Sequence, residues 1–471
     1  LKGGRHMYVA IEPTVKCRPE AFGGLAFIPS RAMVVELNKP AYRTVNFIAQ
    51  NGVTMDETIL GQYSVNARED IRRFIQNLVH SSVLKQCKSK NESSCKSQVS
   101  FGVESTMQNT ISGQKRYSKF LSAPIFAWWD ITKACNFHCK QCYSNSGKAS
   151  KNELTTKEVF SVIEQFAENK IFYIYFLGGE PLMRKDFFQI LDKCREHGVT
   201  TMMSTNGWFV DQNIAKQLYE TGIQIVRVSI DGATAKTHDE IRGMQGSFEK
   251  ALQALEILKK ADIPNVGVSP TLLVDNYLEV DKIIDLALSY DVDEVQVVQL
   301  CSTGRGKNLN ALDLEQFKKA RQLVKQSLES HPKNHITATE GILRKQCERC
   351  VSNRTAMPSF IGCPGGRSCM AINEIGNVSP CILYRKYAGS FRKSTFQEIW
   401  HNSPLFDSMR EVKEGCQDCT YADACAGECP VATETTSETD KKMFAHNIAG
   451  QNINSNGCNN HIGGHLCFTR F

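Results

Sequence analysis

The chain has 471 residues, 41% of them hydrophobic, which excludes wholesale disorder and allows about three domains. Its net charge of +7 is uneven: residues 1–124 carry 17 Lys and Arg against 9 Asp and Glu, and the remainder 39 against 40. The sequence has no Gly-rich phosphate loop and no alternation of basic and aromatic residues. Nucleic-acid binding therefore explains the basic N-terminal part poorly. No signal peptide or 18-residue apolar run is evident, so we expect no membrane partner and a reducing cytoplasm for the nineteen cysteines.

The N-terminal part has the pattern of short strands followed by three helices. Two strands are predicted over residues 25–28 and 33–37, and helices over 41–50, 55–63 and 67–84. This order is typical of a small winged-helix module, and DNA-binding winged helices share it. The next segment, to residue 117, is rich in Lys, Ser, Gln and Asn and indicates a linker.

A regular alternation of strands and helices begins at residues 125–129. Thr155-Thr156-Lys157-Glu158 is a capping box that predicts a helix over residues 156–169. The buried strand expected over 171–177 then ends at Gly178-Gly179-Glu180-Pro181. Further strands are predicted over the ranges 200–204, 225–230, 266–273 and 294–300. Together they indicate a parallel barrel or part of one.

Polar residues follow the barrel strands at the ends where catalytic groups usually lie. They are Ser204, Asn206, Ser229 and Asp231. The alternative is that Ser204-Thr205-Asn206-Gly207 and Asp231-Gly232 are plain turns. No catalytic residue is assigned among them.

Three cysteines stand close together between the first strand and its helix. In Cys135-x3-Cys139-x2-Cys142 no fourth cysteine is near. A [4Fe–4S] cube takes one thiolate per iron, so three thiolates leave one iron open to bind a reactant. Half of a zinc site is the alternative.

The C-terminal third carries a denser cysteine pattern. Its cysteines are Cys363, Cys369, Cys381, Cys416, Cys419, Cys425, Cys429, Cys458 and Cys467. Pairs of the Cys-x2-Cys kind also occur in zinc ribbons, so zinc is the competing metal here. The additional pair Cys347 and Cys350 has no assigned role.

The three-cysteine loop followed one βα unit later by Gly-Gly-Glu-Pro resembles the radical SAM superfamily, where SAM is S-adenosylmethionine. The resemblance implies that an electron from the cluster cleaves SAM to a 5′-deoxyadenosyl radical. Gly178, Gly179, Glu180 and Pro181 would receive the methionine ammonium, and Ser229 and Arg242 its carboxylate. Ser204, Asn206 and Asp231 would help to fix the cofactor. Gln141 replaces the aromatic residue common before the third cysteine, so the adenine contact is not assigned.

The later cysteines resemble the SPASM extension of radical SAM enzymes, which holds auxiliary [4Fe–4S] clusters. The resemblance assigns one cluster to Cys363, Cys369, Cys381 and Cys429. A second would use Cys416, Cys419, Cys425 and a late cysteine, with Cys458 preferred to Cys467.

The N-terminal module resembles the PqqD-like recognition element of RiPPs, which are ribosomally made, post-translationally modified peptides. Such elements bind the leader of a precursor peptide as an added strand at an open sheet edge. The whole chain is therefore similar to the sactipeptide, ranthipeptide and streptide maturases. Its expected partners are a precursor peptide with a leader and an electron donor such as flavodoxin or ferredoxin.

The predicted fold class is α/β: a partial (β/α)6 barrel with an N-terminal winged-helix-like module and a C-terminal iron–sulfur domain. The predicted boundaries are the ranges 7–84, 85–124, 125–345 and 346–471. The expected activity forms a thioether or carbon–carbon crosslink in a peptide. One alternative is a radical SAM/SPASM enzyme for a small molecule or tetrapyrrole. The other is a non-catalytic iron–sulfur electron carrier or peptide-binding protein.

Overall fold

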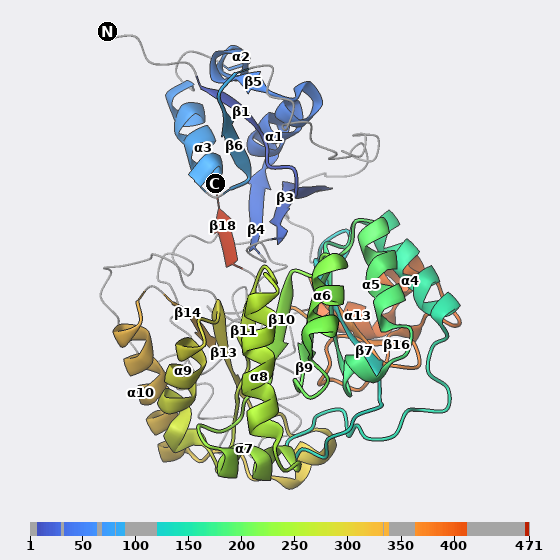
Figure 1. Cartoon of the computed structure of the whole chain (residues 1–471). Coiled ribbons are helices and arrows are strands. Elements are labelled where there is room, and N and C mark those ends of the chain that lie inside the picture. Colours follow the sequence, from blue (N-terminus) through green and yellow to red (C-terminus); the bar gives the residue numbers. More distant parts are fainter. Residues whose placement is uncertain are drawn as a thin grey trace. The chain divides into compact units, whose positions relative to one another are not determined.

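The computed structural model describes residues 7–29, 33–63, 68–80, 82–89, 120–332, 334–338 and 363–411, and residues 467–470 as a backbone strand. By its contacts the chain divides into two compact units (Figure 1). Unit 1 comprises residues 1–118 and 465–471, and unit 2 comprises residues 119–464.

In the part of unit 1 that the structure describes, two small sheets combine with three helices. Its strands are β1 (Tyr8–Ile11), β2 (Lys16–Glu20), β3 (Gly23–Ile28), β4 (Met33–Asn38), β5 (Thr54–Met55), β6 (Leu84–Cys87) and β18 (Cys467–Arg470). Its helices are α1 (Lys39–Asn51), α2 (Asp56–Leu60) and α3 (Arg68–His80). One sheet has the strand order β5-β1-β6 and the other β18-β4-β3-β2. Apolar side chains of both sheets and of the helices form one core.

The structure confirms the two predicted N-terminal strands as β3 and β4 and the first helix as α1. The second helix is shorter than predicted. The third ends at His80 rather than at residue 84, because Ser82 takes a positive φ of 63° and the chain then pairs with β1 as β6. Strand β2 was not predicted, since Lys16–Glu20 is mostly charged; its Arg18–Glu20 ion pair of 2.9 Å is buried.

The described residues of unit 2 form one sheet of eleven strands. They are β7 (Phe126–Thr132), β8 (Tyr173–Gly178), β9 (Thr200–Thr205), β10 (Ile225–Val228), β11 (Val266–Val268), β12 (Thr271–Leu272), β13 (Glu294–Gln299), β14 (His335–Ala338), β15 (Cys369–Ile372), β16 (Asn377–Ser379) and β17 (Gly389–Ser390). Its main path runs β12-β13-β11-β10-β9-β8-β7-β15-β16-β17, and β14 pairs with β13. Pairs from β7 to β14 are parallel, as predicted.

The predicted strand over 266–273 is divided into β11 and β12 at Pro270, which has no N–H to donate to a neighbouring strand. The carbonyl of Pro270 still accepts a hydrogen bond from the Val298 N–H at 2.8 Å. The other predicted strands of the alternation agree with β7, β8, β9, β10 and β13 within a few residues.

The helices of unit 2 surround its sheet (Figure 1). They are α4 (Thr156–Glu168), α5 (Phe187–Glu196), α6 (Gln212–Glu220), α7 (Ala235–Arg242), α8 (Ser247–Lys260), α9 (Val280–Ser289), α10 (Leu314–Ser330), α12 (Phe396–Asn402) and α13 (Pro404–Arg410), with the short 3-10 helices η4 (Pro181–Met183), η5 (Tyr277–Glu279) and η6 (Gly304–Asn308). The capping box predicted at Thr155 and Glu158 is present at the start of α4.

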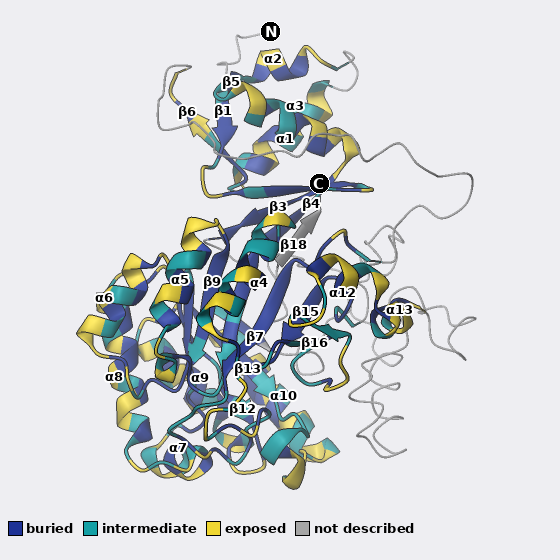
Figure 2. Ribbon diagram, turned by 90° about the vertical axis from the view of Figure 1, so that its right-hand side faces the viewer, coloured by how far each residue is buried: buried dark blue, intermediate teal, exposed yellow. Residues whose placement is uncertain are grey.

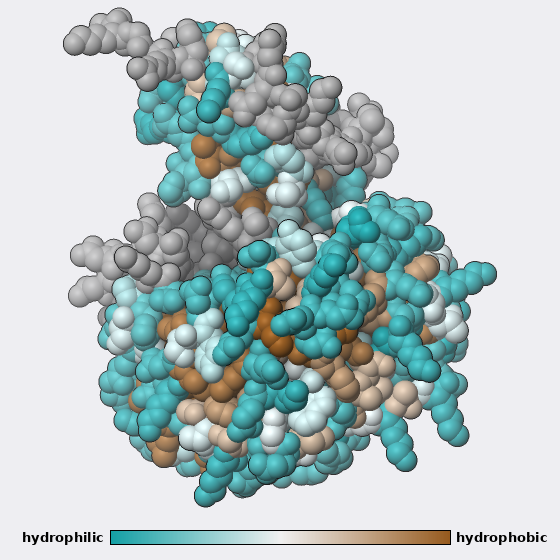
Figure 3. Space-filling view, in the orientation of Figure 1, coloured by the Kyte–Doolittle hydropathy of each residue, from teal (hydrophilic) through white to brown (hydrophobic). Residues whose placement is uncertain are grey.

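The core of unit 2 lies between the sheet and these helices. Figure 2 shows buried strands and helices with exposed outer faces, and Figure 3 shows mostly hydrophilic side chains on those faces. Strand β15 extends the sheet by pairing in parallel with β7, with Cys369 opposite Phe126. The described segment with Cys369 therefore continues the same sheet. Within the described residues, no helix is long and apolar enough to cross a membrane.

Candidate functional site

The three clustered cysteines lie in the loop that follows β7. Its backbone is fixed at both ends: the Cys135 N–H donates to the Gly147 carbonyl at 2.8 Å, and the Gly147 N–H to the Lys133 carbonyl at 3.0 Å. The end of α7 also holds the loop, because the Lys140 N–H donates to the Ile241 carbonyl at 3.0 Å. Residues 133–147 are hereafter called the cysteine loop.

The glycine pair of Gly-Gly-Glu-Pro is required by close packing against this loop. Gly178 has a φ of +118°, which favours glycine, and a Cβ on Gly179 would lie 2.0 Å from the Ala134 carbonyl oxygen. The Gly179 and Glu180 N–H groups each donate at 2.8 Å to the carbonyls of Thr132 and Ala134. The end of β8 is thus bonded to the residues that lead into Cys135.

Glu180 is 1% exposed and forms the N-cap of η4, which begins at Pro181. Its carboxylate accepts hydrogen bonds from the Asn206 N–H at 2.8 Å and the Thr205 hydroxyl at 2.9 Å. Burial raises the pKa of Glu180 to about 7, although these hydrogen bonds oppose the shift. The Asn206 side chain donates to Asn136 at 2.8 Å, so Glu180, Asn206 and the cysteine loop form one network.

Asp231 connects the cysteine loop to the neighbouring strand ends. It is fully buried, and its carboxylate accepts from Gln141 at 2.7 Å, from Arg242 at 3.0 Å and from the Thr271 N–H at 2.7 Å. The Arg242 guanidinium also lies over the Phe137 ring, 5.6 Å from its centroid. Asp231 therefore positions Gln141 and Arg242.

The two serines predicted at the strand ends, Ser204 and Ser229, make different hydrogen bonds. Ser204 lies at the end of β9 and shares a 2.7 Å hydrogen bond with the Tyr175 hydroxyl. Ser229 directly follows β10 and is partly exposed; its N–H donates to the Thr205 carbonyl at 3.0 Å. Ser229 and Thr205 therefore join the ends of two neighbouring strands.

Arg305 in η6 is a residue that the sequence analysis missed. Its guanidinium donates to the Cys139 carbonyl at 2.8 Å and to the Ser146 carbonyl at 2.7 Å, and its N–H donates to the Cys142 carbonyl at 2.8 Å. Gly304 allows this approach, since a Cβ there would lie 2.4 Å from the Cys142 carbonyl oxygen. Gly304-Arg305-Gly306 lies shortly beyond the predicted strand 294–300, but nothing in the sequence connects it with the cysteine loop.

The residues of the cysteine loop fit a thiolate-bound iron–sulfur cluster with an anionic group beside it. Burial raises the pKa of Cys135 to about 11 and also raises that of Cys139, so these two thiols keep their protons unless a metal displaces them. Burial also opposes ionisation of Cys142, but hydrogen bonds from Ser144 and Ser146 outweigh it and lower the Cys142 pKa. Asn136 Nδ2 and Arg242 Nε are buried donors without an acceptor in the described part of the chain. Such donors suit an added anionic group, such as a carboxylate.

No three His, Cys, Asp or Glu side chains of the described residues converge as a site for a single metal ion. A cube takes one thiolate per iron, so its ligands need not converge on one ion.

Three of the later cysteines gather at β15. Cys369 is fully buried, and its burial, with Cys363 and Cys381 nearby, raises its pKa well above the ordinary value. The Gly366 N–H donates to the Cys369 carbonyl at 2.9 Å, which folds the segment after Cys363 back onto β15. The predicted ligands Cys416, Cys419, Cys425, Cys429 and Cys458 lie outside the described residues, as do Cys347 and Cys350.

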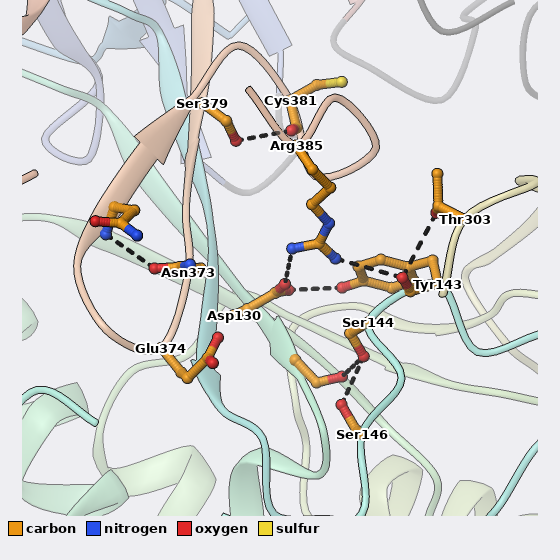
Figure 4. Close-up of polar contacts among 12 residues, drawn as sticks. Asp130, Tyr143, Ser144, Ser146, Thr303, Asn373, Glu374, Ser379, Cys381 and Arg385 are labelled. Carbon is orange, nitrogen blue, oxygen red and sulfur yellow. Dashed lines mark hydrogen bonds and ion pairs between the residues drawn. The ribbon is translucent and has the colours of Figure 1, made fainter. Parts of the chain in front are cut away.

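A pocket of about 280 Å³ lies between the cysteine loop and the β15–β16 hairpin. Buried Asp130 on its wall accepts from the Tyr143 hydroxyl at 2.7 Å and lies 3.6 Å from the Arg385 guanidinium (Figure 4). Burial raises the pKa of Asp130, while Arg385 and Tyr143 oppose the shift. Tyr143 follows Cys142, and Arg385 follows Cys381 by four residues, so this polar group joins the two cysteine regions.

Comparisons with known proteins agree with this arrangement. Residues 129–287 match the Radical SAM superfamily, and residues 363–420 match SPASM, an iron–sulfur cluster-binding domain. The chain is 31% identical over 320 residues to an AdoMet-dependent heme synthase of Methanosarcina barkeri, covering 65% of this chain and 91% of that protein. It is 31% identical over 324 residues to the mycofactocin maturase MftC of Mycobacterium tuberculosis, covering 68% and 81%.

The fold has a match among solved structures. Streptococcus suis SuiB bound to S-adenosylmethionine matches with a TM-score of 0.65 at 17% identity, covering 91% of this chain and 97% of that chain.

A cysteine loop after the first strand of a parallel sheet, bonded to a Gly-Gly-Glu-Pro strand end, defines an α/β enzyme that uses S-adenosylmethionine and iron–sulfur clusters. The chain belongs to the radical SAM superfamily and carries a SPASM domain. The predicted radical SAM superfamily, its SPASM extension, and the use of S-adenosylmethionine and iron–sulfur clusters by an enzyme are thus confirmed.

Proposed function

We propose that the chain is a maturase that uses SAM to crosslink a ribosomally made precursor peptide, through a thioether or a carbon–carbon bond. The observation that carries the proposal is the pairing of a SAM and iron–sulfur unit with a separate small unit that has a core of its own and an excess of basic residues. The 31% identity to MftC, a mycofactocin maturase, supports it. The fold match to SuiB, solved with its precursor peptide SuiA, is consistent with it.

The proposal includes the finer fold assignment. The parallel strands of unit 2 would form the partial (β/α)6 barrel, and β2–β4 followed by α1–α3 would form a PqqD-like recognition element. In this interpretation the leader adds to a sheet edge of unit 1 and the core peptide reaches unit 2. Residues 346–471 would form the SPASM domain and a C-terminal tail.

The roles of the predicted site residues are part of this proposal. Cys135, Cys139 and Cys142 would hold the SAM-binding cluster, which when bound supplies the electron that cleaves SAM. Glu180 and Arg242 would orient the methionine of SAM, and Asn206 would hold Glu180 in position through its 2.8 Å hydrogen bond. Cys363, Cys369 and Cys381, with Cys429, would hold the first auxiliary cluster.

The polar pocket suits a reacting peptide side chain. Asp130 and Arg385 offer an acceptor and a donor beside the cysteine loop, and Glu374 adds a second buried carboxylate. We therefore place the modified residue at this pocket. The electron donor remains a proposed partner, for which a flavodoxin or ferredoxin is suited.

A tetrapyrrole is the second candidate substrate, because an AdoMet-dependent heme synthase is among the relatives. The test supplies reduced, reconstituted protein and SAM with either the precursor peptide or an iron tetrapyrrole, for which Fe-coproporphyrin III, named in another relative, serves as the probe. Deoxyadenosine formed in step with altered peptide supports the maturase. Deoxyadenosine formed in step with altered tetrapyrrole would replace the maturase proposal with the alternative.

A further inference from the structure

Residues near the end of the sequence belong to the sheet of unit 1. Strand β18 pairs in parallel with β4, with Cys467 opposite Met33, Thr469 opposite Val35 and Arg470 opposite Glu36. By contacts, residues 465–471 group with unit 1, although the preceding residues group with unit 2. Figure 1 draws β18 beside β4.

The partner of β18 is a fixed edge. On its other side β4 pairs with β3 over six residue pairs, from Met33 with Ile28 to Asn38 with Gly23. Val34, Val35 and Leu37 of β4 are fully buried in unit 1. Strand β4 is therefore held in place against the core. Its backbone N–H and C=O groups have fixed positions for pairing with a further strand.

An edge of this kind recognises backbone more than side chains. Strand addition derives its affinity from main-chain hydrogen bonds, so peptides of different sequence can use the same edge. Edges that are left unpaired also attract unwanted strands, and proteins commonly cover them. A segment of the same chain can pair with such an edge and so keep unwanted strands away. Another strand can still displace that segment.

We propose that the β4 edge is a docking site for an extended peptide strand and that residues 467–470 occupy it in cis, so that a leader peptide must displace them. This inference rests on the proposed function for its second ligand, the leader. The sequence analysis expected the leader to bind at an open sheet edge. In the structure the edge of β4 is already paired with β18. It also gives Cys467 a place in unit 1, whereas Cys363, Cys369 and Cys381 belong to unit 2.

The size of the effect depends on the tether. A tethered strand with an effective concentration of about 1 mM and a Kd of about 0.1 mM would weaken leader binding about tenfold. Releasing the strand should therefore strengthen leader binding by the same factor.

The first experiment uses the full chain with Thr469→Pro, and Thr469→Ala as the matched control. Both variants remove the hydroxyl, but only proline removes the backbone N–H and resists strand pairing. We expect the proline variant to bind a fluorescent leader peptide about tenfold more tightly by anisotropy. Those amides of β4, within residues 33–38, that face β18 should also exchange hydrogen faster in the absence of leader, whereas those that face β3 should not. Equal affinity and equal exchange in the two variants would overturn the inference.

The second experiment separates the inference from the proposed function. A labelled peptide of residues 463–471, with Cys467→Ser to prevent oxidation, is added to a chain that ends at Gly464. Binding of this peptide, and its displacement by unlabelled leader, supports the shared edge. If the peptide binds but the leader binds no form of the protein, the leader proposal fails and the docking edge stands. If the leader binds all forms equally and the peptide does not bind, the inference alone fails.

Discussion

Glu180 is the residue at which the motif, the strand end and the cysteine loop meet. Its carboxylate is buried, and its acceptor positions face Thr205 and Asn206 from the neighbouring strand end. A carboxylate that is held in this way can receive an ammonium group without moving.

Glu180→Gln should therefore weaken SAM binding while leaving the iron content unchanged. The loss of one charge-assisted hydrogen bond costs about 1.5–3 kcal/mol, so the Kd for SAM should rise by at least about tenfold. Equilibrium dialysis of the reconstituted protein measures it. Glu158→Gln, in the exposed capping box of α4, is the matched control. Equal SAM affinity in both variants would remove Glu180 from the proposed site.

Arg305 fixes the cysteine loop through the carbonyls of Cys139 and Ser146. Lysine keeps the charge but cannot reproduce this forked contact. In Arg305→Lys, we expect the iron of the SAM-binding cluster to be removed by a chelator several-fold faster, since about 1 kcal/mol is lost per neutral-acceptor hydrogen bond. Arg392→Lys, which affects an ion pair with Glu158 on the surface, serves as the control. Identical release rates would contradict the positioning role.

At the scale of elements, the parallel sheet contains a buried ion pair that depends on a glycine. Arg227 on β10 pairs with Glu294 on β13, across β11. A Cβ on Gly267 of β11 would lie 2.7 Å from Glu294 Cγ and 3.3 Å from Arg227 Cγ. Burial opposes ionisation of Glu294, but Arg227 outweighs it and lowers the Glu294 pKa to about 2. This contribution to stability is present above pH 4.5 and is lost as the pH falls from about 4.5 to 2.

Gly267→Ala should disturb this ion pair and lower the free energy of unfolding by roughly 2–4 kcal/mol. Urea unfolding at neutral pH measures the change. Gly147→Ala is a control, because a Cβ there would meet open space. An unchanged midpoint in Gly267→Ala would show that the pair tolerates the added methyl group.

Local signals explain which elements could be predicted. The capping box at Thr155, the β8 strand and the glycine pair at Gly178 are encoded within a few residues, and the structure has them where the sequence places them. Strands β6 and β18 depend on partners far away in the chain, so no local pattern indicates them. Arg305 contacts a loop that lies about 160 residues earlier in the chain. The spacing of residues in the sequence cannot predict such a contact.

The whole molecule joins two units with separate cores, and the proposed cluster ligands all fall within the residues of unit 2. If both proposed auxiliary clusters form, the reconstituted protein should hold about twelve irons, at four per [4Fe–4S] cube. Iron and sulfide analysis gives this number directly. A firm value near eight would mean that one auxiliary site, as we propose it, does not exist.

The central claim is that the cluster at Cys135, Cys139 and Cys142 drives crosslinking of a precursor peptide. Mass spectrometry of the precursor after coexpression tests it most directly, with Cys139→Ala as the paired variant and Cys194→Ala, a buried thiol of α5, as the control. Forming one thioether or carbon–carbon crosslink removes two hydrogen atoms from the peptide. We predict this mass loss with the unaltered enzyme and with Cys194→Ala, and an unchanged peptide with Cys139→Ala. The same mass loss with Cys139→Ala, or an unchanged peptide with the unaltered enzyme, would contradict the claim.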